Sequence, residues 1–192
     1  MTKVYILHGW DGSPDEPLFR WLEKNLKEKG FEVIIPAMPH PENPTIGDWV
    51  KMASELESDE ETIFVGHSIG CQTILRTLEK YEGGKKIQGI VLIAPWMRLD
   101  EETIKEEGQE IIEIAKPWME TPIDFEKVRS HTGKVVAVFS DDDPYVRRDQ
   151  ADFFKNKLGA EIIFEEKKGH FSPSDKVVEV PSILNAILNI TK

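Results

Sequence analysis

The chain is 192 residues long and strongly acidic, with a formal net charge of −11 and a hydrophobic content of 40%. This length suits one folded unit, so we expect residues 1–192 to form a single domain, and the net charge argues against nucleic acid or an anionic membrane surface as a partner. No apolar run approaches the roughly 18 residues of a membrane span, and the single cysteine, Cys71, excludes an internal disulfide.

The first part of the chain alternates between strand and helix patterns. The apolar run Val4–Leu7 suits a buried strand better than a signal peptide, and from this we expect a cytoplasmic protein. A helical spacing of apolar residues follows Pro17, which suits a first helical turn, and Phe31–Ile35 predicts a second strand. Thr45, with Asp48 three residues later, resembles a capping box and indicates the start of another helix.

The rest of the chain continues this alternation. Strands are predicted at Thr62–Val65, Ile87–Ala94, Lys134–Phe139 and Glu161–Phe164, with helical spacing between most of them and a terminal helix from Pro181. The alternation predicts an α/β fold with about six mostly parallel strands and helices on both faces. Sheets of this kind place their sites beyond the carboxyl ends of the strands, so the residues that follow each strand are the candidates for a functional site.

The connection between the fourth and fifth predicted strands is unusually long for such a fold. Its residues 96–131 include four large apolar side chains, Trp96, Met97, Trp118 and Met119. Two interpretations stay open. The segment forms a small cap that walls a substrate pocket, or it is an ordinary helix packed on the sheet with aromatic core residues.

The segment Gly66-His67-Ser68-Ile69-Gly70 matches the pattern G-x-S-x-G. It directly follows a predicted strand and directly precedes a helical pattern, which is the context of a nucleophile elbow. In such a turn the serine has a strained backbone, and glycines flank it because a Cβ at either position would collide with the neighbouring strand or helix. Ser68 is therefore the candidate nucleophile, and the alternative is a glycine turn with an inert serine.

A serine hydroxyl needs a base within hydrogen-bond reach to act as a nucleophile at neutral pH. Of the five histidines, His170 lies just past the sixth predicted strand, where a loop can fold back over the elbow. His8 and His67 stand beside glycines and suit loop architecture, whereas His40 and His131 lie in polar connections. The chain order of serine, carboxylate and histidine suits an α/β-hydrolase and favours His170 as the base.

The carboxylate that orients the base is expected after a late strand. Asp141, Asp142 and Asp143 directly follow the fifth predicted strand, so position alone leaves three candidates, and a solvated turn that caps a helix is a further alternative. Pro144 restricts Asp143 to an extended conformation, which is one reason to prefer Asp143 over Asp142.

Four stretches carry a resemblance to a known family: VYILHGW at 4–10, VGHSIGCQTILR at 65–76, FSDDDPYV at 139–146 and KKGHF at 167–171. Over nearly its full length the chain resembles the small α/β-hydrolases that include the retinoblastoma-binding protein 9 and the YdeN-like bacterial serine hydrolases. The resemblance implies a minimal α/β-hydrolase fold that lacks the first two strands of larger members.

The resemblance also implies roles for individual residues. It assigns the nucleophile to Ser68, the acid to Asp143 and the base to His170. It further implies an oxyanion hole formed by the backbone N–H groups of Trp10 and Ile69, two donors aimed at the charge that develops during acyl transfer.

The chain departs from the family pattern at two points. Arg147 stands where many relatives carry proline, which bears on the shape of the acid loop. No Leu-x-Cys-x-Glu sequence occurs, so the protein partner that named one relative is not expected here.

Together these observations predict a serine hydrolase that works through an acyl-enzyme, in particular a carboxylesterase acting on small acyl esters, without a cofactor or a metal ion. The alternative is a catalytically idle α/β-hydrolase fold that serves as a binding or interaction protein. No metal-ligand spacing such as H-E-x-x-H occurs, and Cys71 suits a packed small residue rather than a nucleophile. The oligomeric state stays open. Six side chains are expected to wall a small apolar pocket: Trp10, Trp96, Met97, Trp118, Met119 and Phe171.

Overall fold

A computed structural model describes all residues, 1–192. Six strands form one parallel sheet in the order β2-β1-β3-β4-β5-β6. Every predicted strand is present, and the parallel α/β architecture expected from the sequence is confirmed. The strands are β1 (Lys3–Leu7), β2 (Glu32–Ile34), β3 (Thr62–His67), β4 (Ile87–Ile93), β5 (Thr132–Ser140) and β6 (Glu161–Glu165).

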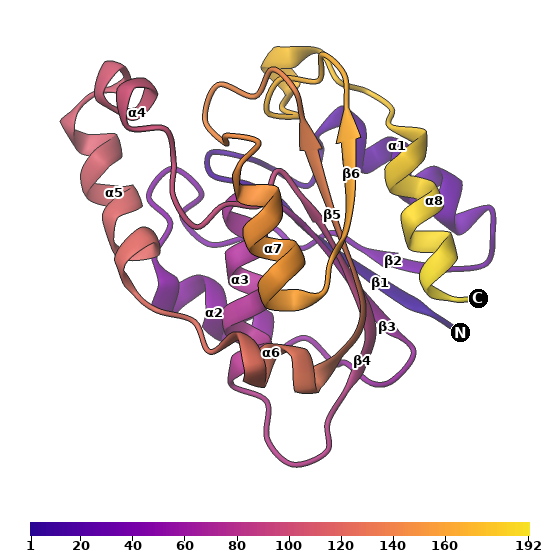
Figure 1. Ribbon diagram of the computed structural model, residues 1–192. Coiled ribbons are helices and arrows are strands. Elements are labelled where there is room, and N and C mark those ends of the chain that lie inside the picture. The colour runs from indigo at the N-terminus through magenta and orange to yellow at the C-terminus, as the bar shows by residue number, and fades with distance from the viewer.

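Helices cover both faces of the sheet (Figure 1). Helices α1 (Pro17–Lys27) and α8 (Pro181–Ile190) pack on one face, where α1 buries the apolar stripe expected from its spacing. The opposite face carries α2, α3, α6 and α7 and buries a larger apolar core. The bounds of these helices are Ile46–Ser54, Ile69–Glu79, Phe125–His131 and Gln150–Leu158, respectively.

The helix ends follow from local chemistry. Thr45 is the N-cap of α2, and its hydroxyl oxygen accepts a hydrogen bond from the backbone N–H of Asp48 at 3.2 Å. Prolines occupy the first helical positions of α1 and α8, where a missing N–H removes no bond inside the helix. Gly159 ends α7 in the left-handed conformation, with φ 66°.

The long connection between β4 and β5 contains α4 (Glu101–Glu107) and α5 (Gln109–Glu120) before α6. Figure 1 shows α4 and α5 standing away from the sheet, with α4 level with its carboxyl edge, whereas α6 lies close to α3. The segment thus combines both interpretations left open by the sequence, because it projects two helices and also buries Trp96 and Trp118 in the core. We call α4 and α5 the cap. No helix has the length and apolar character needed to cross a membrane.

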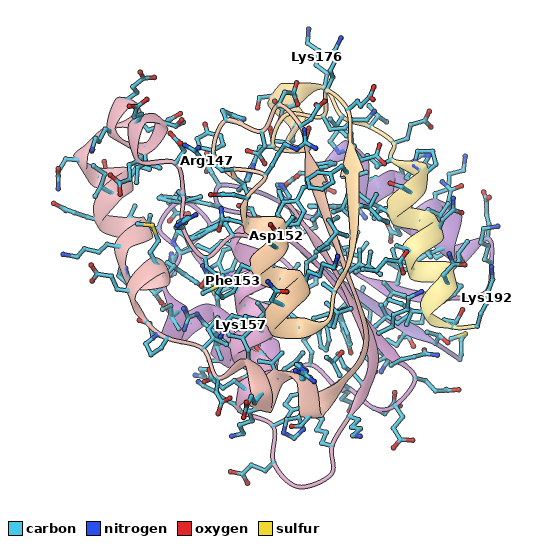
Figure 2. All side chains as sticks on the ribbon, viewed as in Figure 1. Arg147, Asp152, Phe153, Lys157, Lys176 and Lys192 are labelled. Carbon is cyan, nitrogen blue, oxygen red and sulfur yellow. The ribbon has the colours of Figure 1, made fainter.

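The cap is hydrogen-bonded to the rest of the protein at a few places. Asp100, the N-cap of α4, forms an ion pair with Arg147 at 3.6 Å, and its backbone N–H donates to the carbonyl of Tyr145. Figure 2 shows Arg147 on the side of the molecule that faces the cap. At the end of α5, the guanidinium of Arg76 donates to the carbonyl oxygens of Trp118 and Thr121 at 3.1 and 2.8 Å. The arginine noted as a departure from the family pattern therefore joins the acid loop to the cap.

Candidate active site

Ser68 lies in a sharp turn between β3 and α3. Its backbone has φ 53° and ψ −119°, which L-residues rarely adopt. The flanking glycines permit the turn, because a Cβ on Gly70 would come within 2.5 Å of the Leu7 carbonyl oxygen and one on Gly66 within 2.8 Å of the Cys71 nitrogen. The turn places Ser68 at the carboxyl edge of the sheet, where the residue is 7% exposed.

A line of hydrogen bonds joins three of the predicted residues. Ser68 Oγ lies 2.9 Å from His170 Nε2, and His170 Nδ1 lies 2.8 Å from Asp143 Oδ2. An ionised carboxylate can only accept, so Nδ1 carries the imidazole proton and Nε2 is left to accept the proton of the serine hydroxyl. The structure thus brings together, across 102 residues of chain, a hydroxyl, a base and an orienting carboxylate.

The turn after β5 fixes the carboxylate of Asp143. Its side chain is only 1% exposed, and its second oxygen, Oδ1, accepts hydrogen bonds from the backbone N–H groups of Tyr145 and Val146 at 2.9 and 3.0 Å. Both carboxylate oxygens are therefore occupied, and the group has one orientation toward the imidazole.

The other two aspartates of this turn bind the histidine loop instead. Asp142 Oδ1 accepts hydrogen bonds from Ser140 Oγ and from the Gly169 N–H at 2.7 and 2.8 Å, and these donors lower the pKa of Asp142. Asp141 Oδ1 accepts from the Lys167 N–H at 2.8 Å. The geometry separates three residues that the sequence could not, because only Asp143 contacts His170.

The backbone of His170 is held from both sides. Its N–H donates to Asp175 Oδ2 at 2.9 Å, and its carbonyl oxygen accepts from His67 Nε2 at 2.7 Å. Burial, followed by the nearby charge of His170, lowers the pKa of His67 to about 3, so this imidazole stays neutral with its proton on Nε2. Sequence reasoning gave His67 only a place in loop architecture, and the available signal was its position next to the nucleophile.

Two backbone N–H groups near Ser68 are free to bind an anion. His8 Nδ1 lies 2.9 Å from the Gly9 carbonyl oxygen, while His8 Nε2 accepts from the Met38 N–H at 3.0 Å. In a trans peptide the Trp10 N–H points opposite to that carbonyl, and it has no acceptor in the protein. Ile69 is the first residue of α3, so its N–H has no partner inside the helix.

A cavity of about 730 Å³ opens over Ser68. Its apolar lining includes Leu99 and three isoleucines of the cap, Ile104, Ile111 and Ile114. Trp96 also lines the cavity, and its indole Nε1 donates to Ser68 Oγ at 3.2 Å. The volume lies in the range of small-molecule sites.

The structure corrects the expected pocket wall, since only Trp10 and Trp96 of the six predicted side chains line this cavity. Trp118 is fully buried, and its indole donates to the Pro44 carbonyl oxygen at 3.1 Å. Phe171 is 1% exposed in the core beneath α1 and α8. The reason is orientation, because composition shows which side chains are large and apolar but not whether each faces the cavity or the core. The two predicted methionines, Met97 and Met119, likewise pack against the core.

The polar lining of the cavity includes Glu16, which sequence reasoning missed. Glu16 is 6% exposed, and its Oε1 accepts from the Ser13 N–H at 3.1 Å. Burial raises the pKa of Glu16, while the Ser13 N–H and the charge of His170 oppose this rise. The only signal in the sequence was the position of Glu16 in the connection that follows the first predicted strand.

The single cysteine of the chain is not available as a nucleophile. No group of three or more His, Cys, Asp or Glu side chains is arranged to hold a metal. Cys71 is fully buried under the elbow, where its thiol donates to the carbonyl oxygens of Gly66 and Ile93 at 3.1 and 3.3 Å. Burial raises the pKa of the Cys71 thiol far above its usual range, so the thiolate that would act as a nucleophile does not form.

Comparisons with known proteins agree with the fold and the family. The structure has the α/β-hydrolase fold. A crystal structure of the ydeN gene product from Bacillus subtilis covers 100% of this chain and 99% of its own, with a TM-score of 0.89 and 24% identity. A carboxylesterase structure from Nitrososphaera gargenis covers 99% of this chain and 89% of its own, with a TM-score of 0.74 and 14% identity.

The sequence comparisons identify the family. Residues 4–188 match the model of a serine hydrolase family, and the chain belongs to that family. YdeN of Bacillus subtilis (strain 168) is 26% identical over 190 residues, which cover 97% of this chain and 95% of the relative. Serine hydrolase RBBP9 of Rattus norvegicus is 25% identical over 171 residues, which cover 88% of this chain and 81% of the relative. The resemblance predicted from the four sequence stretches is confirmed.

Proposed function

We propose that this serine hydrolase is a carboxylesterase that works through an acyl-enzyme, with Ser68 as nucleophile, His170 as general base and Asp143 as the orienting carboxylate. The observation that carries the proposal is the unbroken line of hydrogen bonds from Ser68 Oγ through His170 to Asp143 Oδ2. These distances lie within the reach that a nucleophile, a base and an orienting group require.

The first half of the reaction forms the acyl-enzyme. Ser68 Oγ attacks the ester carbonyl carbon while its proton moves to His170 Nε2, and Asp143 stabilises the imidazolium that results. The carbonyl oxygen becomes an oxyanion that accepts hydrogen bonds from the N–H groups of Trp10 and Ile69. The C–O bond to the alcohol then breaks, and His170 gives its proton to the leaving oxygen.

Water completes the cycle. His170 Nε2 takes a proton from a water molecule, the hydroxide attacks the acyl carbon, and the same two N–H groups bind the second oxyanion. The bond to Ser68 Oγ breaks, Oγ regains its proton from His170, and the carboxylic acid leaves. The indole of Trp96, which donates to Ser68 Oγ in the free protein, is placed to favour the oxygen while it carries negative charge.

We further propose short acyl groups, of roughly two to six carbons, as the preferred acyl part. The support is the apolar lining of the cavity, which includes Trp96, Leu99 and Ile104. Each methylene that fits contributes about 0.8 kcal/mol of apolar burial, and the first that does not fit meets close-packed side chains.

A fluorophosphonate probe followed by a panel of acyl esters tests the proposal. We expect covalent labelling at Ser68 and values of kcat/KM that rise with chain length and then fall beyond about six carbons. Absence of labelling and of ester cleavage would favour an idle binding protein with this fold. A continued rise to ten or more carbons would show that the acyl pocket is not small.

A further inference from the structure

The lining of the cavity over Ser68 is acidic, and its only basic side chains are the imidazoles of His67 and His170. None of its lining residues is a lysine or an arginine, and five are carboxylates: Asp11, Glu16, Glu42, Glu107 and Glu110. None of the five forms an ion pair with a lysine or an arginine. The one ion-pair partner of the set is the imidazole of His40, which lies 3.6 Å from Glu42. Such a lining attracts cations and repels anions.

Three lysines lie near His170 in the chain, and none of them lines the cavity: Lys167, Lys168 and Lys176. Lys176 follows His170 by six residues in the chain. Figure 2 shows Lys176 projecting outward from the tip of the loop, away from the body of the protein. The charges that line the cavity are therefore those of the five carboxylates and, when it is protonated, of His170.

Glu16 is the carboxylate of this lining that offers a defined position for a cation. Four of the five carboxylates belong to exposed residues, whereas Glu16 is 6% exposed. Its Oε1 accepts from the Ser13 N–H, but its Oε2 accepts no hydrogen bond although the residue lines the cavity. A carboxylate removed from water and left with an unused oxygen is stabilised by a cation that enters beside it.

The position of Glu16 relative to His170 indicates which half of an ester would carry the charge. His170 must give its proton to the leaving oxygen, so the alcohol part lies on the His170 side of the nucleophile. Glu16 lines the same cavity as His170, and it is close enough for the imidazolium charge to act on it. The isoleucines of the cap supply apolar lining that suits the acyl group.

We propose that the protein selects esters whose alcohol part bears a positive charge, and that Glu16 binds this charge; the inference rests on the proposed esterase function. Aromatic side chains support the same ligand chemistry. Trp10, Trp96 and Tyr145 line the cavity, and faces of such rings attract an ammonium group. Glu16 is thus a specificity-determining residue outside the line from Ser68 to Asp143.

Two esters of nearly equal shape test the proposal. Butyrylcholine and 3,3-dimethylbutyl butyrate share the acyl group and differ at one atom of the alcohol, a charged nitrogen in place of a neutral carbon. We expect kcat/KM to be about tenfold or more higher for butyrylcholine, as for a partly desolvated charge pair. A ratio near one or below, with labelled Ser68 and cleavage of the neutral ester, would overturn the inference and leave the esterase proposal standing.

Variants assign the effect to Glu16. Glu16→Gln keeps an oxygen for the Ser13 N–H and removes only the charge, so the ratio of the two kcat/KM values should fall to near one. Glu106→Gln removes an exposed charge of α4 that does not line the cavity, and its ratio should match the wild type. A high ratio retained in Glu16→Gln would overturn the assignment.

Binding without turnover gives an independent measurement. In Ser68→Ala, butyrylcholine should raise the thermal midpoint more than the neutral ester, and Glu16→Gln added to that variant should abolish the difference. Equal shifts for both esters would also overturn the inference. Failure of wild-type labelling together with failure to cleave either ester would instead reject the esterase proposal itself.

Discussion

The two sides of the active-site cavity are built in different ways. On one side, Ser68, Asp143 and His170 follow strands of the sheet, and their loops are joined by further hydrogen bonds from Asp142 and His67. On the other side, the cap stands off the sheet, and its hydrogen bonds to the rest of the protein lie in and beside α4 and at the end of α5.

This difference separates chemistry from substrate selection. Groups that must keep their mutual distances are fixed by several backbone contacts each, so a change among them should affect turnover more than folding. The cap has fewer attachments, so a change at one of them should affect stability and substrate binding more than the chemical step.

The largest expected effect is on the strand-end side. Ser68→Ala removes the nucleophile and should lower turnover by roughly 10³–10⁶, while the free energy of unfolding changes by less than about 1 kcal/mol. Ester hydrolysis and urea unfolding measure the two quantities. Hydrolysis retained at the wild-type rate would refute the acyl-enzyme mechanism. A large loss of stability would contradict the expectation that changes among the reacting residues affect turnover more than folding.

The second test divides the acid turn. Asp143→Asn should lower kcat by about 10³–10⁴, because the amide no longer holds the imidazole in the required tautomer. Asp141→Asn and Asp142→Asn should keep most of the activity, since asparagine still offers an oxygen to the backbone donors of the histidine loop. Measured kcat values decide, and an equal loss in Asp142→Asn would show that the loop contact matters as much as the triad contact.

The third test concerns the cap. Arg76→Leu leaves the buried carbonyl oxygen of Trp118 and the partly buried one of Thr121 without this donor, so it should lower the free energy of unfolding by about 2–4 kcal/mol. Hydrogen exchange should quicken in α5, while kcat for a small ester stays within about tenfold of the wild type. Arg129→Leu, at an exposed position on α6, is the matched control. Unchanged stability in Arg76→Leu would mean that the cap is anchored elsewhere.

The last test concerns the pH dependence of stability. The unfolded chain binds a proton on His67 below about pH 6.5, whereas the folded protein does so only near pH 3, so acid favours unfolding across this window. His67→Gln should reduce the fall of unfolding free energy with decreasing pH by up to about 1.4 kcal/mol per pH unit. Urea unfolding at several pH values between 4 and 7 measures this pH dependence. His40→Gln, a change at an exposed histidine, is the control. Parallel curves for wild type and His67→Gln would contradict the assignment.

The sequence predicted the sheet well because each strand is a short apolar run between turn residues. The elbow was also visible, because its glycines form a known pattern between a predicted strand and a predicted helix. A Cβ on Gly66 would collide with the start of α3, and one on Gly70 with the end of β1. The three reacting residues could be proposed because each follows a strand, and the carboxyl ends of parallel strands share one edge.

What the sequence could not predict depends on the direction of side chains between distant segments. Asp142 and Asp143 are adjacent and chemically identical, and only the path of the turn decides which one reaches His170. Trp118 and Trp96 are both large and apolar, yet one is core and the other donates to the nucleophile. Glu16 lies in a surface-like run of polar residues, and its burial depends on the loops that fold over it.

The closed environment of Cys71 supplies the protein with an internal reporter. Thiol reagents reach a cysteine only when it is exposed and ionised, and the carbonyl oxygens of Gly66 and Ile93 hold this thiol three residues beyond Ser68. Alkylation of the native protein therefore requires the elbow to open. The alkylation rate, measured by the change in mass, therefore reports how often the elbow opens. Because Cys71 is part of the natural sequence, no label has to be introduced.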